Sequence, residues 1–141
     1  MGHKFFVDSR VLIPRPETEL IVDWVLGLPL NKNSTILEVG TGSGCIGISI
    51  CLKHKDLKIL ATDLSDAALE VAKINRELHN ANNVNFVQSN WLACSMDSSL
   101  DLVISNPPYI KPNDPHLREL NHEPSIALTS KNGSQSFLHI A

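Results

Sequence analysis

The sequence is 141 residues long, with 43% apolar and 19% charged residues, which suits one globular domain rather than a disordered chain. Its formal net charge is −3 and it has no cluster of Lys and Arg, so direct nucleic-acid binding is not expected. It contains no apolar stretch of about 18 residues and no signal-peptide pattern, which predicts a cytoplasmic protein without a membrane partner. The three cysteines and six histidines lack metal-ligand spacing, so no metal site is predicted.

The first predicted element is a helix over residues 16–26. Pro16 suits the first helical position, where its missing amide would have no partner, and Gly27 ends the helix. Glu17 and Glu19 fall in the first turn, where the helix dipole favours negative charge. The apolar stripe expected to face the core is formed by Leu20, Ile21, Trp24 and Val25.

Residues 35–50 predict a short apolar strand, a glycine-rich turn and an apolar helix that reaches about Leu52 and is buried on all sides. Glycines at positions 40, 42 and 44 allow a ligand to approach the backbone closely. A dinucleotide fingerprint requires a smaller residue where this chain has Cys45, and the carboxylate of Glu38 would repel a pyrophosphate. The turn therefore favours a cationic or hydroxyl-bearing ligand.

A second strand, predicted over residues 57–63, ends in Asp63. This acid follows the glycine turn by about 20 residues, the separation at which a carboxylate binds ribose hydroxyls. The alternative role for Asp63 is to cap the next helix, predicted over residues 66–79. Ser65 is at least as well placed for that capping role, which leaves Asp63 for the ligand.

Two further strands are predicted over residues 84–88 and 100–105, joined by a loop through Trp91. Strands that alternate with helices are typical of an α/β fold with a parallel sheet, in which ligands bind at the carboxyl ends of the strands. The polar groups that follow the predicted strands are therefore expected to line one crevice. They are the glycine turn, Asp63, Asn90 and Asn106.

The last predicted strand runs directly into Asn106-Pro107-Pro108-Tyr109. Proline fixes its own φ and holds the preceding residue extended, so Asn106 and Pro107 form a rigid pair of hydrogen-bond acceptors. Asn106 Oδ1 and the Pro107 carbonyl can accept both N–H bonds of a planar NH2 group, while Tyr109 covers its flat face. The motif predicts a substrate with an amide or an exocyclic amine, and the alternative is that Pro-Pro only ends the strand.

The glycine turn, Asp63 and the Asn-Pro-Pro-Tyr motif make the chain resemble the HemK/PrmC family of S-adenosylmethionine-dependent protein-(glutamine N5) methyltransferases. The family-specific parts are residues 6–19, from Phe6 to Glu19, and the later His122-Glu123-Pro124. The resemblance implies a class I, Rossmann-like methyltransferase fold. It also implies S-adenosylmethionine as the cofactor and class 1 peptide chain release factors as partners, with the glutamine of their Gly-Gly-Gln motif as the methylated residue.

The resemblance also implies roles for individual residues. Cofactor contacts are expected at Glu38, Gly40, Thr41, Gly42, Gly44, Asp63, Asn90, Trp91 and Asn106. Contacts to the substrate glutamine are expected at Asn106, Pro107, Pro108, Tyr109, Arg15 and Glu123, of which Asn106, Pro107 and Tyr109 are expected to take part in catalysis. Two positions depart from the family pattern: Asn90 stands where Asp is usual, and His122 stands where an aromatic residue is common.

The family's catalytic sheet has seven strands in the order 3-2-1-4-5-7-6 and follows a small helical domain. Residues 1–141 are expected to form the N-terminal and central part of one such domain, truncated after the fourth strand, without the helical domain and the last three strands. Residues 110–133 predict a polar loop, after which a helix begins at Ser134. Two alternative functions stay open: an adenine or guanine amino-group methyltransferase acting on nucleic acid, and a fragment that binds cofactor or release factor without turnover.

Overall fold

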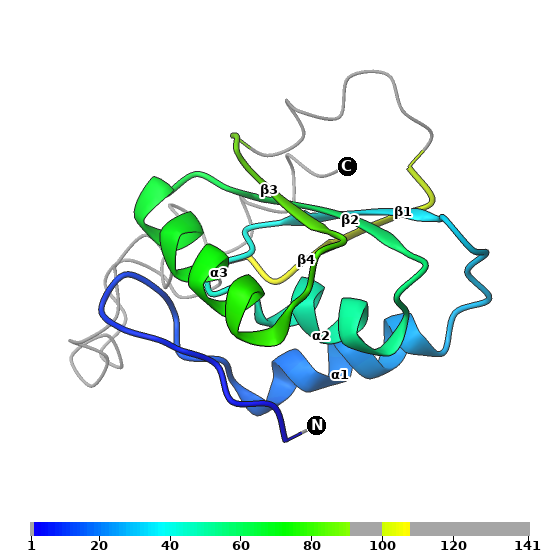
Figure 1. Cartoon of the computed structure of the whole chain (residues 1–141), viewed down its shortest axis with the longest axis horizontal. Coiled ribbons are helices and arrows are strands. Elements are labelled where there is room, and N and C mark those ends of the chain that lie inside the picture. The colour runs from blue at the N-terminus through cyan, green and yellow to red at the C-terminus, as the bar shows by residue number, and fades with distance from the viewer. Residues whose placement is uncertain (1, 91–99, 108–141) are drawn as a thin grey trace.

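The computed structural model describes residues 2–90 and 100–107, whose helices and strands are labelled in Figure 1. In chain order they are α1 Pro16–Leu26, β1 Thr35–Val39, α2 Cys45–Lys53, β2 Lys58–Asp63, α3 Asp66–His79, β3 Val84–Gln88 and β4 Leu102–Ser105. The predicted bounds of α1, α3 and β3 are confirmed, whereas β2 and β4 begin slightly later than the sequence predicted.

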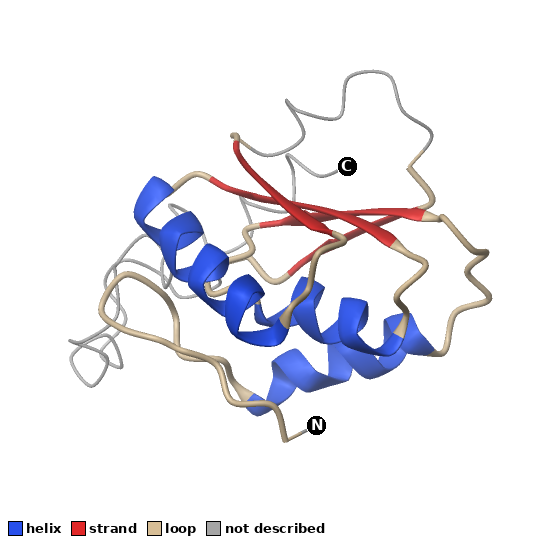
Figure 2. Cartoon of the chain, viewed as in Figure 1, coloured by secondary structure: helices blue, strands red, loops and turns tan. Residues whose placement is uncertain are grey.

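The four described strands form one parallel sheet in the order β3-β2-β1-β4. Strand β1 lies between β2 and β4, with Thr35 aligned to Lys58 and Ile36 aligned to Leu102. Figure 2 shows all three helices on the same face of this sheet. The expected α/β fold with a parallel sheet is therefore confirmed, and these strands have the family's 3-2-1-4 order.

The core is centred on β1 and α2, which lie next to each other at the middle of the domain. Every residue of β1 after Thr35 is buried, and α2 is buried without a break from Ile46 to Cys51, as its all-round apolar sequence predicted. Large side chains such as Ile48 and Ile50, each 0% exposed, anchor α2 in this core. The glycine turn between β1 and α2 therefore has a rigid support on both sides.

Helix α3 begins and ends at local signals that the sequence carries. The Ser65 hydroxyl accepts a hydrogen bond from the Ala68 amide at 3.2 Å, which confirms Ser65 as the cap. At the other end Asn80 adopts a left-handed conformation, with φ of 53°, and its amide donates to the carbonyls of Arg76 and Glu77. Within the described ranges, no helix has the length and apolar character needed to cross a membrane.

The apolar stripe predicted for α1 is partly wrong. The helix buries Val22 and Val25, which are 2% and 1% exposed, but leaves Leu20 and Trp24 67% and 59% exposed. The two valines belong to the main core, whereas Leu20 and Trp24 lie beside Val103 of β4 at a shallow depression. Among the described strands, β4 pairs only with β1, so this apolar face adjoins a strand edge that has no partner within residues 2–90 and 100–107.

We predict that the 141-residue chain self-associates through this face, because an unpaired edge with adjacent apolar side chains is a template for contacts between chains. Trp24→Glu should shift sedimentation velocity profiles towards the monomer. Leu78→Glu is the matched control, since Leu78 is 61% exposed on α3 and outside this face. A wild-type chain that stays monomeric at high concentration would contradict the prediction.

Candidate active site

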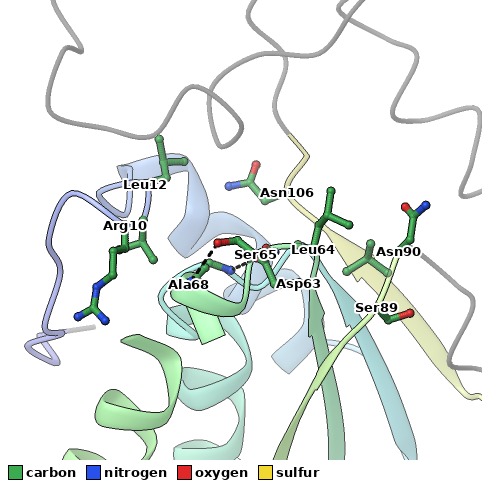
Figure 3. Close-up of a pocket in the computed structure, with 13 residues that line it drawn as sticks. Arg10, Leu12, Asp63, Leu64, Ser65, Ala68, Ser89, Asn90 and Asn106 are labelled. Atoms are coloured by element: carbon green, nitrogen blue, oxygen red, sulfur yellow. Dashed lines mark hydrogen bonds between the residues drawn. The ribbon is translucent and has the colours of Figure 1, made fainter. Parts of the chain in front are cut away.

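A pocket opens where the four strands reach their carboxyl ends (Figure 3). It brings together five of the residues that the sequence placed in one crevice: Gly40, Gly42, Asp63, Asn90 and Asn106. The remaining wall is formed by residues that the sequence did not assign to the crevice: Arg10, Val11, Leu12, Val39, Leu64, Ser65, Ala68 and Ser89. The predicted convergence of the strand ends is confirmed, while the role of each residue stays a prediction.

The Asp63 carboxylate joins two parts of the pocket wall. Its Oδ2 accepts a hydrogen bond from the Gly42 amide at 2.8 Å, and its Oδ1 accepts one from the Ser65 amide at 2.9 Å. An ionised carboxylate has about four acceptor positions, so each oxygen retains capacity for a further donor such as a ligand hydroxyl. Asp63 therefore fixes the glycine turn and still presents acceptors to the pocket.

The glycine turn exposes its backbone to the pocket. Gly40 and Gly42 adopt φ of 73° and 55°, the left-handed region that other residues rarely occupy, and a Cβ at either position would meet no atom within 4 Å. The space that side chains would fill is thus open to a ligand. Gly44 differs, because a Cβ there would approach Ile48 Cδ1 at 3.0 Å, so this glycine permits packing behind the turn.

The Glu38 carboxyl lies behind the pocket wall and is 1% exposed. Its Oε2 accepts a hydrogen bond from the Gly47 amide at 3.1 Å, and a Cβ on Gly47 would come within 2.5 Å of that oxygen. Burial raises the pKa of Glu38 to about 8, and the nearby Thr41 hydroxyl and the Gly47 amide oppose this shift. Burial thus favours the neutral form of this carboxyl in the ligand-free chain.

Two buried polar atoms next to the turn have no hydrogen-bond partner within the part of the chain that the structure describes: Glu38 Oε1 and Thr41 Oγ1. The Thr41 hydroxyl affects the pKa of Glu38 but does not reach hydrogen-bond geometry with it. Unsatisfied buried polar atoms are costly, and a ligand in the adjacent pocket is one way to satisfy them. The predicted cofactor contacts of Glu38 and Thr41 stay predictions, because neither residue lines the pocket.

Asn106 reaches the pocket from the end of β4. Its Nδ2 lies 3.5 Å from Thr18 Oγ1 of α1, a long hydrogen bond that orients the amide, and the Ser105 hydroxyl holds the strand end by donating to the Val39 carbonyl at 3.0 Å. Thr18 is buried and Pro107 is buried. The Asn106 amide thus contacts α1 through Thr18, a residue that the sequence did not assign to the site.

Some predicted substrate residues are not part of this pocket. Arg15 lies at a neighbouring cavity between α1, α2 and the N-terminal segment, defined here as residues 2–15, and Thr18 borders the same cavity. The predicted site residues Trp91, Pro108, Tyr109 and Glu123 lie outside the described residues, as does His122. In residues 2–90 and 100–107, no group of three or more His, Cys, Asp or Glu side chains is placed to hold a metal ion.

The N-terminal segment supplies a pocket wall that sequence patterns did not reveal. Val11 and Leu12 line the pocket, and Figure 3 shows Leu12 on the opposite side from Ser89 and Asn90. The Arg10 guanidinium is bound to the Asp8 carboxylate, with an N–O distance of 2.6 Å, and this hydrogen-bonded pair lowers the pKa of Asp8. The positive charge of Arg10 is therefore already paired within the segment.

The residues of the pocket fit a ligand with hydroxyl groups and positive charge. Open space over Gly40 and Gly42 admits the ligand to the backbone, and Asp63 offers carboxylate oxygens. The strand order and the position of the pocket are those of Rossmann-like α/β folds, which include the class I methyltransferases.

Comparison with known proteins places the chain within this class. Residues 18–123 match the Methyltransferase small domain family. The release factor glutamine methyltransferase of Coxiella burnetii is 40% identical over 135 residues, which cover 95% of this chain and 49% of that protein. The protein of the same name from Neisseria gonorrhoeae is 42% identical over 132 residues, covering 91% of this chain and 48% of that protein. The chain thus spans about half the length of the curated relatives it matches.

A solved structure supports the fold alone. The hMettl16 catalytic domain, in complex with the MAT2A 3'UTR hairpin 6, aligns with a TM-score of 0.72 at 22% identity, covering 97% of this chain and 54% of that one. The chain belongs to the Methyltransferase small domain family, and the predicted resemblance to the HemK/PrmC methyltransferases is confirmed. Its cofactor is S-adenosylmethionine, the methyl donor of this class of enzyme.

The buried Glu38 carboxyl generates a prediction about pH. Its pKa of about 8 in the folded chain lies above its ordinary value of 4.5. The folded state therefore binds the proton more tightly, and the resulting stabilisation is complete below pH 4.5 and lost as pH rises through 8. The free energy of unfolding should fall by at most about 1.4 kcal/mol per pH unit over this window.

Thermal unfolding of the ligand-free chain between pH 5 and about pH 9 tests this slope. Glu38→Gln should flatten the decline in Tm, because glutamine does not titrate, and its amide oxygen can still accept the Gly47 hydrogen bond. Glu77→Gln, at an exposed position of α3, is the control and should follow the wild-type profile. Parallel profiles for wild type and Glu38→Gln would show that the carboxyl is ionised when folded.

Proposed function

We propose that this chain is the cofactor-binding part of an enzyme that methylates the side-chain amide nitrogen of glutamine in the Gly-Gly-Gln motif of class 1 peptide chain release factors. The observation that carries the proposal is Asn106, whose amide borders the pocket at the end of β4 and is oriented by Thr18. Support also comes from the relatives named release factor glutamine methyltransferase. Release factors act in translation, so the proposal includes a cytoplasmic location.

The pocket residues divide the work of binding. Gly40 and Gly42 would let the cofactor lie against the backbone, and Asp63 would accept hydrogen bonds from its ribose hydroxyls. Asn90 lines the same pocket and has an acceptor for an adenine amino group. When bound, the cofactor supplies an electrophilic methyl group on a positively charged sulfur.

The substrate amide is a poor nucleophile because its nitrogen lone pair is delocalised into the carbonyl. Asn106 Oδ1 and the Pro107 carbonyl would accept its two N–H bonds, which fixes the orientation of the nitrogen. The same acceptors stabilise the positive charge that the nitrogen gains during transfer. No general base is required in this scheme, since the proton can leave after the methyl group has been transferred.

An amino-group methyltransferase acting on adenine or guanine remains the second candidate, since the acceptors of Asn106 and Pro107 suit an exocyclic amine as well. The hMettl16 catalytic domain, solved in complex with the MAT2A 3'UTR hairpin 6, shares only the fold with this chain. Methyl transfer to a release factor, a Gly-Gly-Gln peptide and an adenine oligonucleotide distinguishes the candidates. Transfer to the oligonucleotide alone would replace the proposed substrate, and cofactor binding without any transfer would favour a non-catalytic fragment.

Asp63→Ala should weaken S-adenosylmethionine binding by about 1.5–3 kcal/mol, roughly 10- to 150-fold in Kd, the scale of hydrogen bonds to a charged group. Isothermal calorimetry measures the difference. Asp66→Ala is the control, because Asp66 is an exposed acid of α3 that does not line the pocket. Equal affinity of wild type and Asp63→Ala would remove Asp63 from the binding site, and a preference for NADH would contradict the cofactor itself.

Asn106→Ala should lower kcat for release-factor methylation by about 100-fold, while the Kd for S-adenosylmethionine changes little, because the lost acceptor acts mainly in the transition state. Labelled methyl transfer to the intact release factor measures kcat. Asn85→Ala, at an exposed position of β3, serves as the control. Unchanged turnover in Asn106→Ala would mean that the Asn-Pro-Pro-Tyr motif has a structural role only.

A further inference from the structure

The N-terminal segment lines the cofactor pocket although it belongs to no helix or strand up to Pro16. Its attachment to α3 is partly apolar: Val11 is 1% exposed and clusters with Ala68 and Val71, and Val7 packs against the same group. Such a small cluster contributes limited stability. A polar contact further along α3 completes the attachment.

That contact is the side-chain amide of Asn75, which is 0% exposed. Asn75 Oδ1 accepts a hydrogen bond from the Phe6 amide at 2.7 Å, and Asn75 Nδ2 donates to the Phe6 carbonyl at 2.9 Å. The side chain thus pairs with both backbone groups of Phe6, as a neighbouring strand residue would in an antiparallel ladder. This pairing fixes the position of the segment along α3.

The same amide also holds the glycine turn. Asn75 Nδ2 donates a second hydrogen bond, at 2.9 Å, to the carbonyl of Ser43, which lies between Gly42 and Gly44. Every donor of the amide is therefore used, with one bond to the N-terminal segment and one to the turn. Asp has no donor at this position and Leu has neither donor nor acceptor, so asparagine is the side chain of this size that joins both.

We propose that Asn75 is a positioning residue for cofactor binding, which holds the N-terminal segment and the glycine turn at a fixed separation across the pocket. The inference rests on the proposed function, in that this pocket binds S-adenosylmethionine. Asn75, Phe6 and Ser43 do not line the pocket, so the effect is transmitted by Leu12 and Val11 on one side and by Gly42 on the other. Glycine-rich backbone has high conformational freedom, and this contact removes part of it before the ligand binds.

The test compares Asn75→Ala with Asn83→Ala. Asn83 also donates a side-chain hydrogen bond to a backbone carbonyl, that of Leu57 at 2.7 Å, but it does not line the pocket. Calorimetry should give a Kd for S-adenosylmethionine that is at least about 10-fold higher in Asn75→Ala than in wild type, and nearly unchanged in Asn83→Ala. An equal Kd in wild type and Asn75→Ala would overturn the inference while leaving the cofactor site intact.

A second measurement, limited proteolysis, uses the protein without bound cofactor. Trypsin cleaves after Lys4 and Arg10, so cleavage there should be several-fold faster in Asn75→Ala than in Asn83→Ala when no cofactor is present. Equal cleavage rates in the two variants would contradict the inference that Asn75 holds the N-terminal segment in place. If the wild-type chain bound no S-adenosylmethionine, the proposed function would fail, and the inference about cofactor binding would fail with it.

If Asn75→Ala does not fold, amide hydrogen exchange in the wild-type chain tests whether Asn75 links the two walls of the pocket. The Phe6 amide is bonded to Asn75 and does not line the pocket. If Asn75 links the two walls, S-adenosylmethionine should slow exchange of the Phe6 amide by at least about 10-fold, as it does for amides of the glycine turn. Slower exchange in the turn with no change at Phe6 would overturn the inference.

Discussion

The domain depends on one carboxylate at the point where β2 ends. Asp63 accepts hydrogen bonds from the amides of Gly42 and Ser65, and in this way it joins the glycine turn to the start of α3. Charge-assisted hydrogen bonds of this kind are stronger than those between neutral groups. The same residue closes the turn after β1, bonds the capping residue of α3 and presents acceptors to the pocket. One side chain therefore both holds the turn in place and lines the pocket.

Behind this carboxylate lies a second acid, Glu38, which differs from Asp63 in burial and in its hydrogen-bond partners. Glu38 is fully enclosed between β1 and α2, and its pKa rises to about 8, whereas Asp63 is partly exposed and bonded to two amides. The two carboxyls occupy neighbouring layers of the same wall, and the Asp63 charge is one of the causes that raise the Glu38 pKa. Entry of a cation into the pocket would favour the ionised form of Glu38, so that ligand binding and proton release are linked.

The parts of the fold that the sequence predicted well are those with local signals. Helices α1 and α3 begin at Pro16 and Ser65, whose effect depends only on the next few residues. Strand starts were less accurate because a strand begins where its partner allows pairing: β4 starts at Leu102, opposite Ile36. The burial of α1 likewise follows from packing between elements: Val22 and Val25 join the core, whereas Leu20 and Trp24 stay exposed beside β4.

In the candidate site too, the residues with local sequence signals were predictable and those held by distant contacts were not. Residues that directly follow strands, such as Asp63 and Asn106, could be placed in one crevice because parallel strands end at the same edge. The N-terminal segment could not, because its contacts with α3 join residues that are far apart in the sequence, such as Phe6 and Asn75, which differ by 69 positions. Neither residue carries a pattern that reports such a pairing. The contact of Thr18 with Asn106 could not be predicted for the same reason, since the two residues are 88 positions apart in the sequence.

The path of the N-terminal segment along α3 has a practical consequence. The carbonyl of Lys4 bonds His79 Nε2 at 2.9 Å, at the carboxyl end of the helix, whereas Ala68 near its amino end lines the pocket. At about 1.5 Å per residue, these two ends of α3 are roughly 16 Å apart. A surface attachment or fluorescent group placed before Lys4 would therefore leave the mouth of the pocket clear, and immobilised protein should still be accessible to small ligands from solution.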